Sequence, residues 1–115
     1  MEVRAVLDLL RGAVVEGVRR DSPDLTARQL AVLLIVYVSE PPHTVRGLAA
    51  ALNVSKPAIT RAIDRLSELN LVRRRIDEAD RRNVLIQRTV PGSVFVSEYT
   101  DLYLRAGLAG VGPTA

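Results

Sequence analysis

Apolar residues repeat at helical spacing through the first part of the chain, residues 2–20. They recur at steps of three and four residues and so form one stripe along a helix, made of Val3, Val6, Leu7, Leu10, Val14 and Val18. Leu9, Ala13 and Val15 widen this stripe beyond what a surface helix needs. The pattern predicts a first helix that either lies deep in the core or is covered by a partner chain. In so short a chain we favour the partner.

Two further helices are predicted from their starting residues. Thr26-Ala27-Arg28-Gln29 forms a capping box, in which the Thr hydroxyl and the Gln side chain each satisfy an amide at the start of a helix. That helix runs to about Ser39, before Pro41-Pro42, and its almost wholly apolar interior predicts the central helix of the core. Thr44 then caps a short helix over residues 45–52, and Asn53-Val54 form a turn.

Ser55 is the expected N-cap of a fourth helix, and Pro57 fits near its start because a missing amide donor costs nothing there. The apolar residues of this helix face inward and are Ala58, Ile59, Ala62, Ile63 and Leu66. The residues that then point outward are Lys56, Thr60, Arg61, Asp64 and Arg65. The helix ends at residues 69–71, where Asn70 can take the left-handed conformation that glycine usually adopts.

A hairpin and a last helix complete the pattern. Two strand-like runs, residues 71–76 and 83–89, flank a polar turn. Pro91-Gly92 then introduces a helix from Ser93 to about Leu108, whose end is expected to fray at Gly107, Gly110, Gly112 and Pro113. The predicted fold class is mainly α with a small β-hairpin, arranged as a winged helix-turn-helix. We expect a single domain over residues 1–115, with terminal helices at 2–20 and 93–110 around a winged helix-turn-helix at 25–92.

Composition narrows the class of protein. A hydrophobic content of 48% suits a globular helical fold. The chain has no run of about 18 apolar residues and no signal-peptide pattern, so we expect no membrane span. It has no cysteine, which excludes a disulfide framework and a thiolate metal site, and a cytoplasmic location is the default expectation.

Positive charge is concentrated in the fourth helix and the hairpin. The whole chain has a net charge of +3, and residues 56–88 contain nine basic groups against five acidic ones. Such a cluster attracts phosphate polyanions and makes binding depend on salt. An ordinary solvated surface is the alternative, because a charged content of 25% is common.

The outward face of the fourth helix suits the DNA major groove, which a helix enters with donors at its amino-terminal end. Ser55 and the first free amides suit a phosphate, and Lys56 is placed for the DNA backbone. Thr60 and Arg61 lie one turn further in, where they reach base edges, with Arg65 beyond them. The alternative is an amphipathic core helix that merely has a charged outer face.

The hairpin turn adds cations beside that helix. Arg81 and Arg82 can reach a narrow minor groove, whose negative potential favours an inserted Arg. Asp80, and similarly Asp64, is expected to orient a guanidinium rather than contact DNA, because phosphate repels a carboxylate. An ordinary salt-bridged hairpin is the alternative.

These residues also carry a family resemblance. The motifs follow in the order Leu25-Thr26-x-x-Gln29, Thr44-Val45-x-x-Leu48-Ala49, Ser55-Lys56-Pro57-Ala58-Ile59-Thr60-Arg61-x-Ile63-Asp64-x-Leu66, Leu71-Val72-x-Arg74, Asp80-Arg81-Arg82 and Thr89-x-x-Gly92. In order and spacing, residues 25–92 resemble the MarR family of bacterial transcription regulators. The resemblance implies a dimeric winged helix-turn-helix protein, in most members a repressor, that binds a double-stranded DNA operator.

The resemblance also implies roles for single residues. The helix from Ser55 is expected to be the recognition helix. Arg74, Arg81 and Arg82 are the wing residues expected to bind DNA, with Arg82 in the minor groove. Asp64 and Asp80 are expected to form the supporting ion pairs.

The chain departs from the family pattern in several places. Asn70 replaces the usual glycine, and Arg88 stands where the family has an inward Leu; it either reaches the ligand region or snorkels. The absence of cysteine excludes the thiol-sensing branch. The terminal helices are shorter than usual, so we expect a reduced dimer interface, to which the last helix contributes Phe95, Tyr99, Leu102, Tyr103 and Ala106.

Many members of the family release DNA when a small phenolic or aromatic acid binds, so a ligand of this class is expected. The candidate ligand residues are Tyr37, His43, Arg88 and Tyr99. We expect His43 to be a surface residue of its loop, and no metal site, because it has no acidic or Cys partner at ligand spacing. No nucleophile, base and orienting group come together in the sequence, so we expect neither catalysis nor a cofactor.

The leading hypothesis is a sequence-specific DNA-binding regulator that acts as a homodimer on a pseudo-palindromic operator. A winged-helix module for protein–protein contact, without specific DNA binding, is the alternative. A small-molecule carrier or an enzyme is a more distant one.

Overall fold

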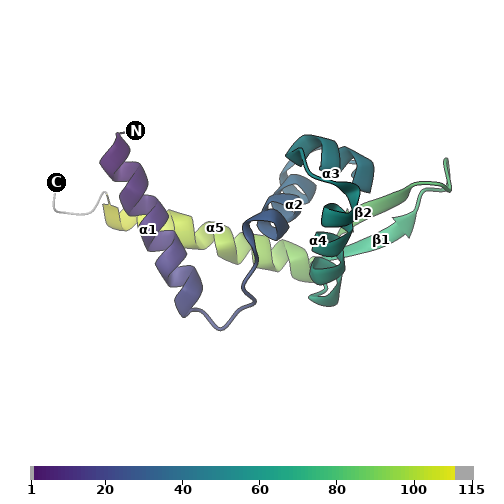
Figure 1. The fold of residues 1–115 in the computed structure, drawn as a ribbon. Coiled ribbons are helices and arrows are strands. Elements are labelled where there is room, and N and C mark those ends of the chain that lie inside the picture. Colours follow the sequence, from purple (N-terminus) through teal and green to yellow (C-terminus); the bar gives the residue numbers. More distant parts are fainter. Residues whose placement is uncertain (1, 111–115) are drawn as a thin grey trace. The chain divides into compact units, whose positions relative to one another are not determined.

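The structure is a computed structural model that describes residues 2–110, and the chain divides into two compact units (Figure 1). One unit runs from Leu25 to Phe95, and the other combines the residues before Leu25 with those from Val96 onward. Residues 2–110 contain five helices and two antiparallel strands, which confirms the predicted fold class. Of the residues predicted to fray, Gly112 and Pro113 lie outside the described part.

Helix α2 (Ala27–Val38) contacts α3, α4 and β2 and is the core helix of the first unit. Its capping box is present, because the Gln29 amide donates to Thr26 Oγ1 at 3.1 Å and the Thr26 amide donates to Gln29 Oε1 at 3.0 Å. Its buried residues are Val32, Leu33 and Val36. The apolar interior is not buried all round, since Leu34 is 37% exposed and Val38 is 77% exposed. A helix turns only one face toward the core on which it packs.

Helices α3 (Val45–Leu52) and α4 (Lys56–Glu68) form the helix-turn-helix. Each begins as predicted, because Thr44 Oγ1 accepts from the Gly47 amide at 3.0 Å and Ser55 Oγ accepts from the Ala58 amide at 3.2 Å. The side-chain oxygen satisfies an amide that has no partner inside the first turn.

Asparagine makes the turn after each of these helices. Asn53 has a φ of 54° and Asn70 a φ of 60°, both in the left-handed region that Asn tolerates better than most residues. Asn70 therefore replaces glycine as predicted. The Leu71 amide turns back to donate to the Leu66 carbonyl at 2.8 Å, which closes the end of α4.

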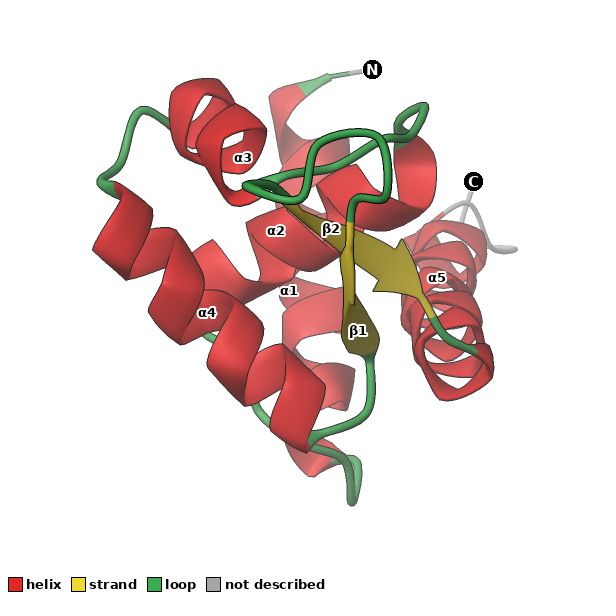
Figure 2. Cartoon of the chain, turned by 90° about the vertical axis from the view of Figure 1, so that its right-hand side faces the viewer, coloured by secondary structure: helices red, strands yellow, loops and turns green. Residues whose placement is uncertain are grey.

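Strands β1 (Val72–Ile76) and β2 (Val84–Arg88) form the wing, paired from Val72↔Arg88 to Ile76↔Val84. Figure 2 shows the two strands beside the helices of this unit, where β1 contacts α4 and β2 contacts α2 and α3. Thr44 forms a bridge to Leu85 on the second side of β2, and the Ile86 amide donates to the His43 carbonyl at 2.8 Å. The segment before α3 thus lies beside β2 and is joined to it by one isolated bridge, which the sequence patterns do not reveal.

Helix α5 begins at Val90, three residues earlier than the predicted start, and ends at Gly110. The Gly92 amide donates to Thr89 Oγ1 at 2.9 Å, so Thr89 acts as the N-cap. Pro91 then lies in the first turn, where its missing amide is not needed. Pro91-Gly92 belongs to the helix rather than to the segment that precedes it.

The second unit contains α1 (Val3–Arg19) and the part of α5 from Val96 onward. These helices approach closely at small residues, since a Cβ on Gly12 would lie 3.0 Å from the Ala106 methyl. Arg20 Nη2 also donates to Glu98 Oε2 at 2.6 Å. No helix within residues 2–110 has both the length and the apolar character to span a bilayer.

Most of the apolar stripe of α1 stays in contact with solvent. Among its residues Ala13 alone is buried, whereas Val3 is 77% exposed and Val18 is 74% exposed. The exposed apolar residues between them are Val6, Leu7, Leu10, Val14 and Val15. Because the stripe is exposed in the single chain, its burial against another chain stays a prediction.

Candidate nucleic-acid interface

Helix α4 separates its residues sharply between two faces. Ala58, Ile59, Ala62, Ile63 and Leu66 are all buried. Every candidate DNA contact on the helix lies on the exposed face, namely Ser55, Lys56, Thr60, Arg61 and Arg65. The apolar residues at helical spacing hold the helix against the core and so leave the polar ones in water.

The exposed face of α4 offers donors that have weak partners or none among residues 2–110. Lys56 makes no side-chain hydrogen bond or ion pair with residues 2–110. Arg61 Nε reaches the Pro57 carbonyl at 3.4 Å, and Arg65 reaches Glu68 at 3.5 Å. Bonds of this length at an exposed site are weak, so both guanidiniums are free to bind another acceptor.

An ion pair joins α4 to the wing. Arg74 on β1 donates to the Asp64 carboxylate on α4, and both side chains are more than one-third exposed. The interaction follows from strand alternation, because Arg74 lies on the same face of β1 as the buried Val72 and so points toward α4. The carboxylate of Asp64 thus orients Arg74, although DNA contact by Arg74 stays a prediction.

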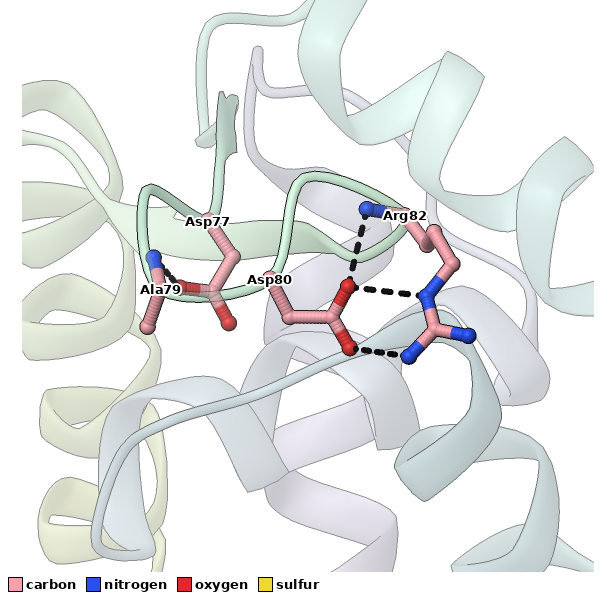
Figure 3. A network of polar contacts seen from close by, with 4 residues as sticks. All are labelled: Asp77, Ala79, Asp80 and Arg82. Atoms are coloured by element: carbon pink, nitrogen blue, oxygen red, sulfur yellow. Dashed lines mark hydrogen bonds and ion pairs between the residues drawn. The ribbon is translucent and has the colours of Figure 1, made fainter.

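The turn of the wing is held by short-range contacts between its own polar residues. Figure 3 shows Asp80 facing Arg82, with Arg82 Nε donating to Oδ1 and Nη2 donating to Oδ2, each at 3.0 Å. The Arg82 amide donates to the same carboxylate at 3.2 Å, and the Ala79 amide donates to Asp77 at 2.9 Å. Two parallel bonds fix the plane of a guanidinium, so Arg82 is aimed while its side chain stays 89% exposed.

Electrostatics at this turn follow from the same pair. The Arg82 side chain, then its backbone amide, holds the pKa of the Asp80 carboxyl below the ordinary value of 3.8, against a slight opposing desolvation. The pair also raises the pKa of the Arg82 guanidinium. Arg81 makes a separate exposed ion pair with Glu78 at 3.1 Å.

Arg46 is a candidate that the sequence patterns missed. It is exposed in the first turn of α3, and its positive charge helps to lower the pKa of Asp80. The wing tip and the start of α3 therefore lie near enough for their charges to interact. A basic residue two positions after the Thr44 N-cap was the signal available in the sequence.

Three of the four candidate ligand residues lie in the first unit, and two of them, His43 and Arg88, line one cavity. The cavity has a volume of about 560 Å³ and is lined by Val36, Pro41, Pro42, His43, Arg73, Leu85, Ile86, Gln87 and Arg88. Tyr37 lies below Arg88, whose guanidinium carbon is 5.8 Å from the centre of the Tyr ring. Tyr99 belongs to the second unit, where it lies 5.7 Å from Tyr103 between ring centres.

His43 is buried rather than a surface residue. It is 8% exposed, and its Nε2 lies 3.2 Å from the Ser39 carbonyl oxygen. The expectation of a surface position was wrong because the loop runs along β2, where the His43 carbonyl accepts from Ile86. A three-residue cluster of His, Cys, Asp or Glu that suits a metal ion does not occur in the described residues.

Arg88 is used largely within the protein. Its Nε donates to the Val36 carbonyl at 2.8 Å, and its Nη2 donates to the Ser39 carbonyl at 3.1 Å. These carbonyls belong to the end of α2, which has no basic residue in its own last turn. The substitution that departs from the family pattern therefore caps α2 from β2.

Sequence and fold comparisons agree on the family. The MarR family model matches residues 25–84, which are 60 of the 115 residues. The S. aureus MepR–DNA complex has a TM-score of 0.75 and 21% identity, over 89% of this chain and 82% of that chain. The regulator BldR from Sulfolobus solfataricus has a TM-score of 0.65 and 26% identity, over 92% of this chain and 76% of that chain.

A ligand-bound regulator is also similar. CouR from Rhodococcus jostii RHA1, bound to p-coumaroyl-CoA, has a TM-score of 0.64 and 25% identity, over 92% of this chain and 69% of that chain. Comparison with curated protein sequences gives no match. Because the family model covers more than half of the sequence and these regulators share its winged helix-turn-helix, the chain belongs to the MarR family.

Proposed function

We propose that this protein is a sequence-specific transcriptional repressor that binds operator DNA as a homodimer in the cytoplasm and releases it on binding a small organic acid. One observation carries the DNA-binding part. A single unit presents the exposed donors of α4 beside a wing whose Arg82 is aimed by Asp80. Catalysis forms no part of the proposal.

Readout of the operator is divided between the helix and the wing. Ser55 and Lys56, at the positive end of the α4 dipole, bind phosphate and set the register. Thr60 and Arg61 read base edges in the major groove, where Arg suits guanine. Arg82 enters the adjacent minor groove, and Arg74, Arg81 and Arg65 add contacts to the backbone.

Selection of bound sites from random duplex DNA tests this function. We expect a pseudo-palindromic site whose half-sites are about 34–36 Å apart, because each protomer contributes one α4. Affinity for that site should fall steeply as salt rises. If Arg61→Ala and Arg82→Ala both leave the affinity unchanged at fixed salt, this binding mode is wrong. A protein partner retained at high salt, with no selected DNA site, identifies the interaction-module alternative instead.

The homodimer is supported by the exposed apolar stripe of α1. Seven of its apolar side chains are at least 39% exposed within the single chain, from Val3 to Val18. A contiguous apolar surface of this kind is typical of a protein interface. Burial of the stripe against a second copy would give the terminal helices a dimer interface. A dimer with two-fold symmetry also matches the two-fold symmetry of an operator.

The small-acid ligand is supported by the cavity beside β2. Its volume of about 560 Å³ lies in the range of ligand sites, and its lining includes Arg73, Arg88 and no carboxylate. Apolar contacts from Pro41, Pro42 and Leu85 suit a flat ligand body. A thermal-shift screen of aromatic acids, with release of operator DNA as the second readout, tests the proposal. Acids that raise the Tm without releasing DNA rule out an inducer role.

A further inference from the structure

The base of the wing shows where its ladder of hydrogen bonds stops. The last pair is Val72↔Arg88, so the next rung would join Leu71 and Thr89. The Ile86 amide points away from β1, toward His43. Amides alternate in direction along a strand, so the Thr89 amide points toward β1 and the Leu71 carbonyl is its natural acceptor.

A tyrosine hydroxyl occupies that rung. The Thr89 amide donates to Tyr37 Oη at 2.9 Å, and Tyr37 Oη lies 2.7 Å from the Leu71 carbonyl oxygen, its nearer acceptor. The Thr89 carbonyl oxygen is a second acceptor at 3.2 Å. The Leu71 amide is meanwhile bonded to Leu66. The direct backbone bond between the two strands is therefore replaced by a relay through a side chain of α2.

The surrounding residues leave room for this hydroxyl and little else. A Cβ on Gly92 would lie 1.8 Å from Tyr37 Oη and 2.2 Å from the Leu71 carbonyl oxygen. Thr89 Oγ1 donates to the Asn70 carbonyl at 2.7 Å and so ties the same two chain segments a second time. The Arg88 guanidinium lies over the Tyr37 ring while it bonds to α2. The ring is thus held on one side by β2 and at its tip by the first turn of α5.

We propose that Tyr37 is a positioning residue for the wing, holding its two strands apart at the base and so setting the direction of its Arg82 tip relative to α4. The inference rests on the proposed DNA-binding function. Removal of the hydroxyl leaves the Thr89 amide and the Leu71 carbonyl to bond directly, which draws the strands together at one end. A change at the base of a stiff hairpin is carried to its tip, and the minor-groove contact is lost first.

The test is a double-mutant cycle on operator binding at fixed salt, with Tyr37→Phe combined first with Arg82→Ala and then with Lys56→Ala. Tyr37→Phe retains the ring and is expected to weaken binding roughly fivefold, the effect of about one net hydrogen bond. In the Tyr37→Phe protein, adding Arg82→Ala should lower the operator affinity little further, because the wing contact is already lost. Lys56→Ala acts on the helix and should stay additive, as independent sites do. Additive costs for both pairs overturn the proposal while leaving the DNA-binding function intact.

A second measurement judges Tyr37 without DNA. Residual dipolar couplings of the free protein are expected to change for amides 77–83 in Tyr37→Phe and to stay constant for amides of α4. Unchanged couplings in the wing overturn the proposal. Failure of Tyr37→Phe to fold also overturns it, since that outcome assigns the hydroxyl to the core. Loss of the DNA-binding function itself appears separately, as unchanged affinity for Arg61→Ala and Arg82→Ala alone.

Discussion

At the scale of single residues, the wing tip is governed by the pair of Asp80 and Arg82. Three donors of Arg82, two of its guanidinium and its backbone amide, converge on one carboxylate. Because the pKa of Asp80 is lowered in the folded protein, the pair is fully formed above the ordinary value of 3.8 and is lost as pH falls through the lowered pKa. At neutral pH the aim of Arg82 does not depend on pH.

Arg82→Ala is expected to raise the pKa of Asp80 toward 3.8, because the largest source of its shift is removed. NMR titration of the Asp80 carboxyl carbon measures the change. Arg65→Ala is the control, since it removes a guanidinium that bonds to Glu68 instead. A pKa that does not move in Arg82→Ala means that the pair does not form in solution.

The two cations of α4 are expected to act differently on DNA. Arg61→Ala should relax the preference at one base position, at a cost of about 1–3 kcal/mol for the preferred base. Lys56→Ala should weaken binding to all sequences alike and lower the slope of log affinity against log salt by about one. Binding to a panel of single-base operator variants at several salt concentrations separates these effects. A uniform loss in Arg61→Ala would move that residue to the DNA backbone.

At the scale of elements, long-range side chains complete what local sequence begins. The starts of α2, α3 and α4 are capped by residues inside their own first turns, and the capping is confirmed in each case. The end of α2 has no basic residue in its own last turn, and the Ser39 carbonyl oxygen lies 3.2 Å from Nε2 of the nearby His43. Its charged cap is Arg88, 49 residues from Ser39 and 52 residues from Val36. Periodicity and capping patterns therefore predict where helices start, whereas this helix end depends on the fold.

Arg88→Leu, which restores the residue usual in the family, is expected to destabilise the protein by about 1 kcal/mol, because two carbonyls at the end of α2 lose a charged donor at a partly solvated site. Urea denaturation measures the change. Arg75→Leu is the matched control on the other strand, since Arg75 has no side-chain partner within residues 2–110 and should change stability by less than about 0.5 kcal/mol. Equal effects for the two variants would show that Arg88 contributes nothing as a cap.

Gly92→Ala is expected to cost about 3 kcal/mol or more, because its Cβ would overlap Tyr37 Oη and a backbone carbonyl that belongs to the base of the wing. Gly17→Ala on α1 is the control, since its Cβ would meet Leu102 at an ordinary 3.7 Å and the helix gains up to about 1 kcal/mol. Thermal unfolding of the two variants should therefore shift in opposite directions. A tolerated Gly92→Ala would mean that α5 starts differently in solution.

At the scale of the whole molecule, the proposed function assigns different tasks to the two units. The unit from Leu25 to Phe95 contains the proposed DNA contacts and the cavity beside β2. The unit that contains α1 has most of its apolar stripe exposed. Under the proposed function, a symmetric pair of the first unit reads DNA, and we expect the second unit to bring the two copies together.

Leu10→Asp is expected to convert the dimer to a monomer, because a buried unpaired carboxylate in the centre of the α1 stripe is costly. Sedimentation at tens of micromolar protein measures the mass. Ala27→Glu is the control, since it adds a carboxylate at the exposed start of α2, where the helix dipole favours it. A wild-type protein that sediments as a monomer at this concentration contradicts the homodimer.

The sequence by itself determined the helix-turn-helix and the hairpin. N-cap residues, apolar spacing and left-handed Asn residues act over a few positions, and α3 and β1 lie within one residue of their predicted bounds. It also placed the exposed cations of α4, because burial of one helix face leaves the other in water. It missed the burial of His43, the cap from Arg88, the start of α5 and the hydroxyl of Tyr37 at the base of the wing. Each of these depends on contacts between segments far apart in the chain, which only the tertiary structure brings together.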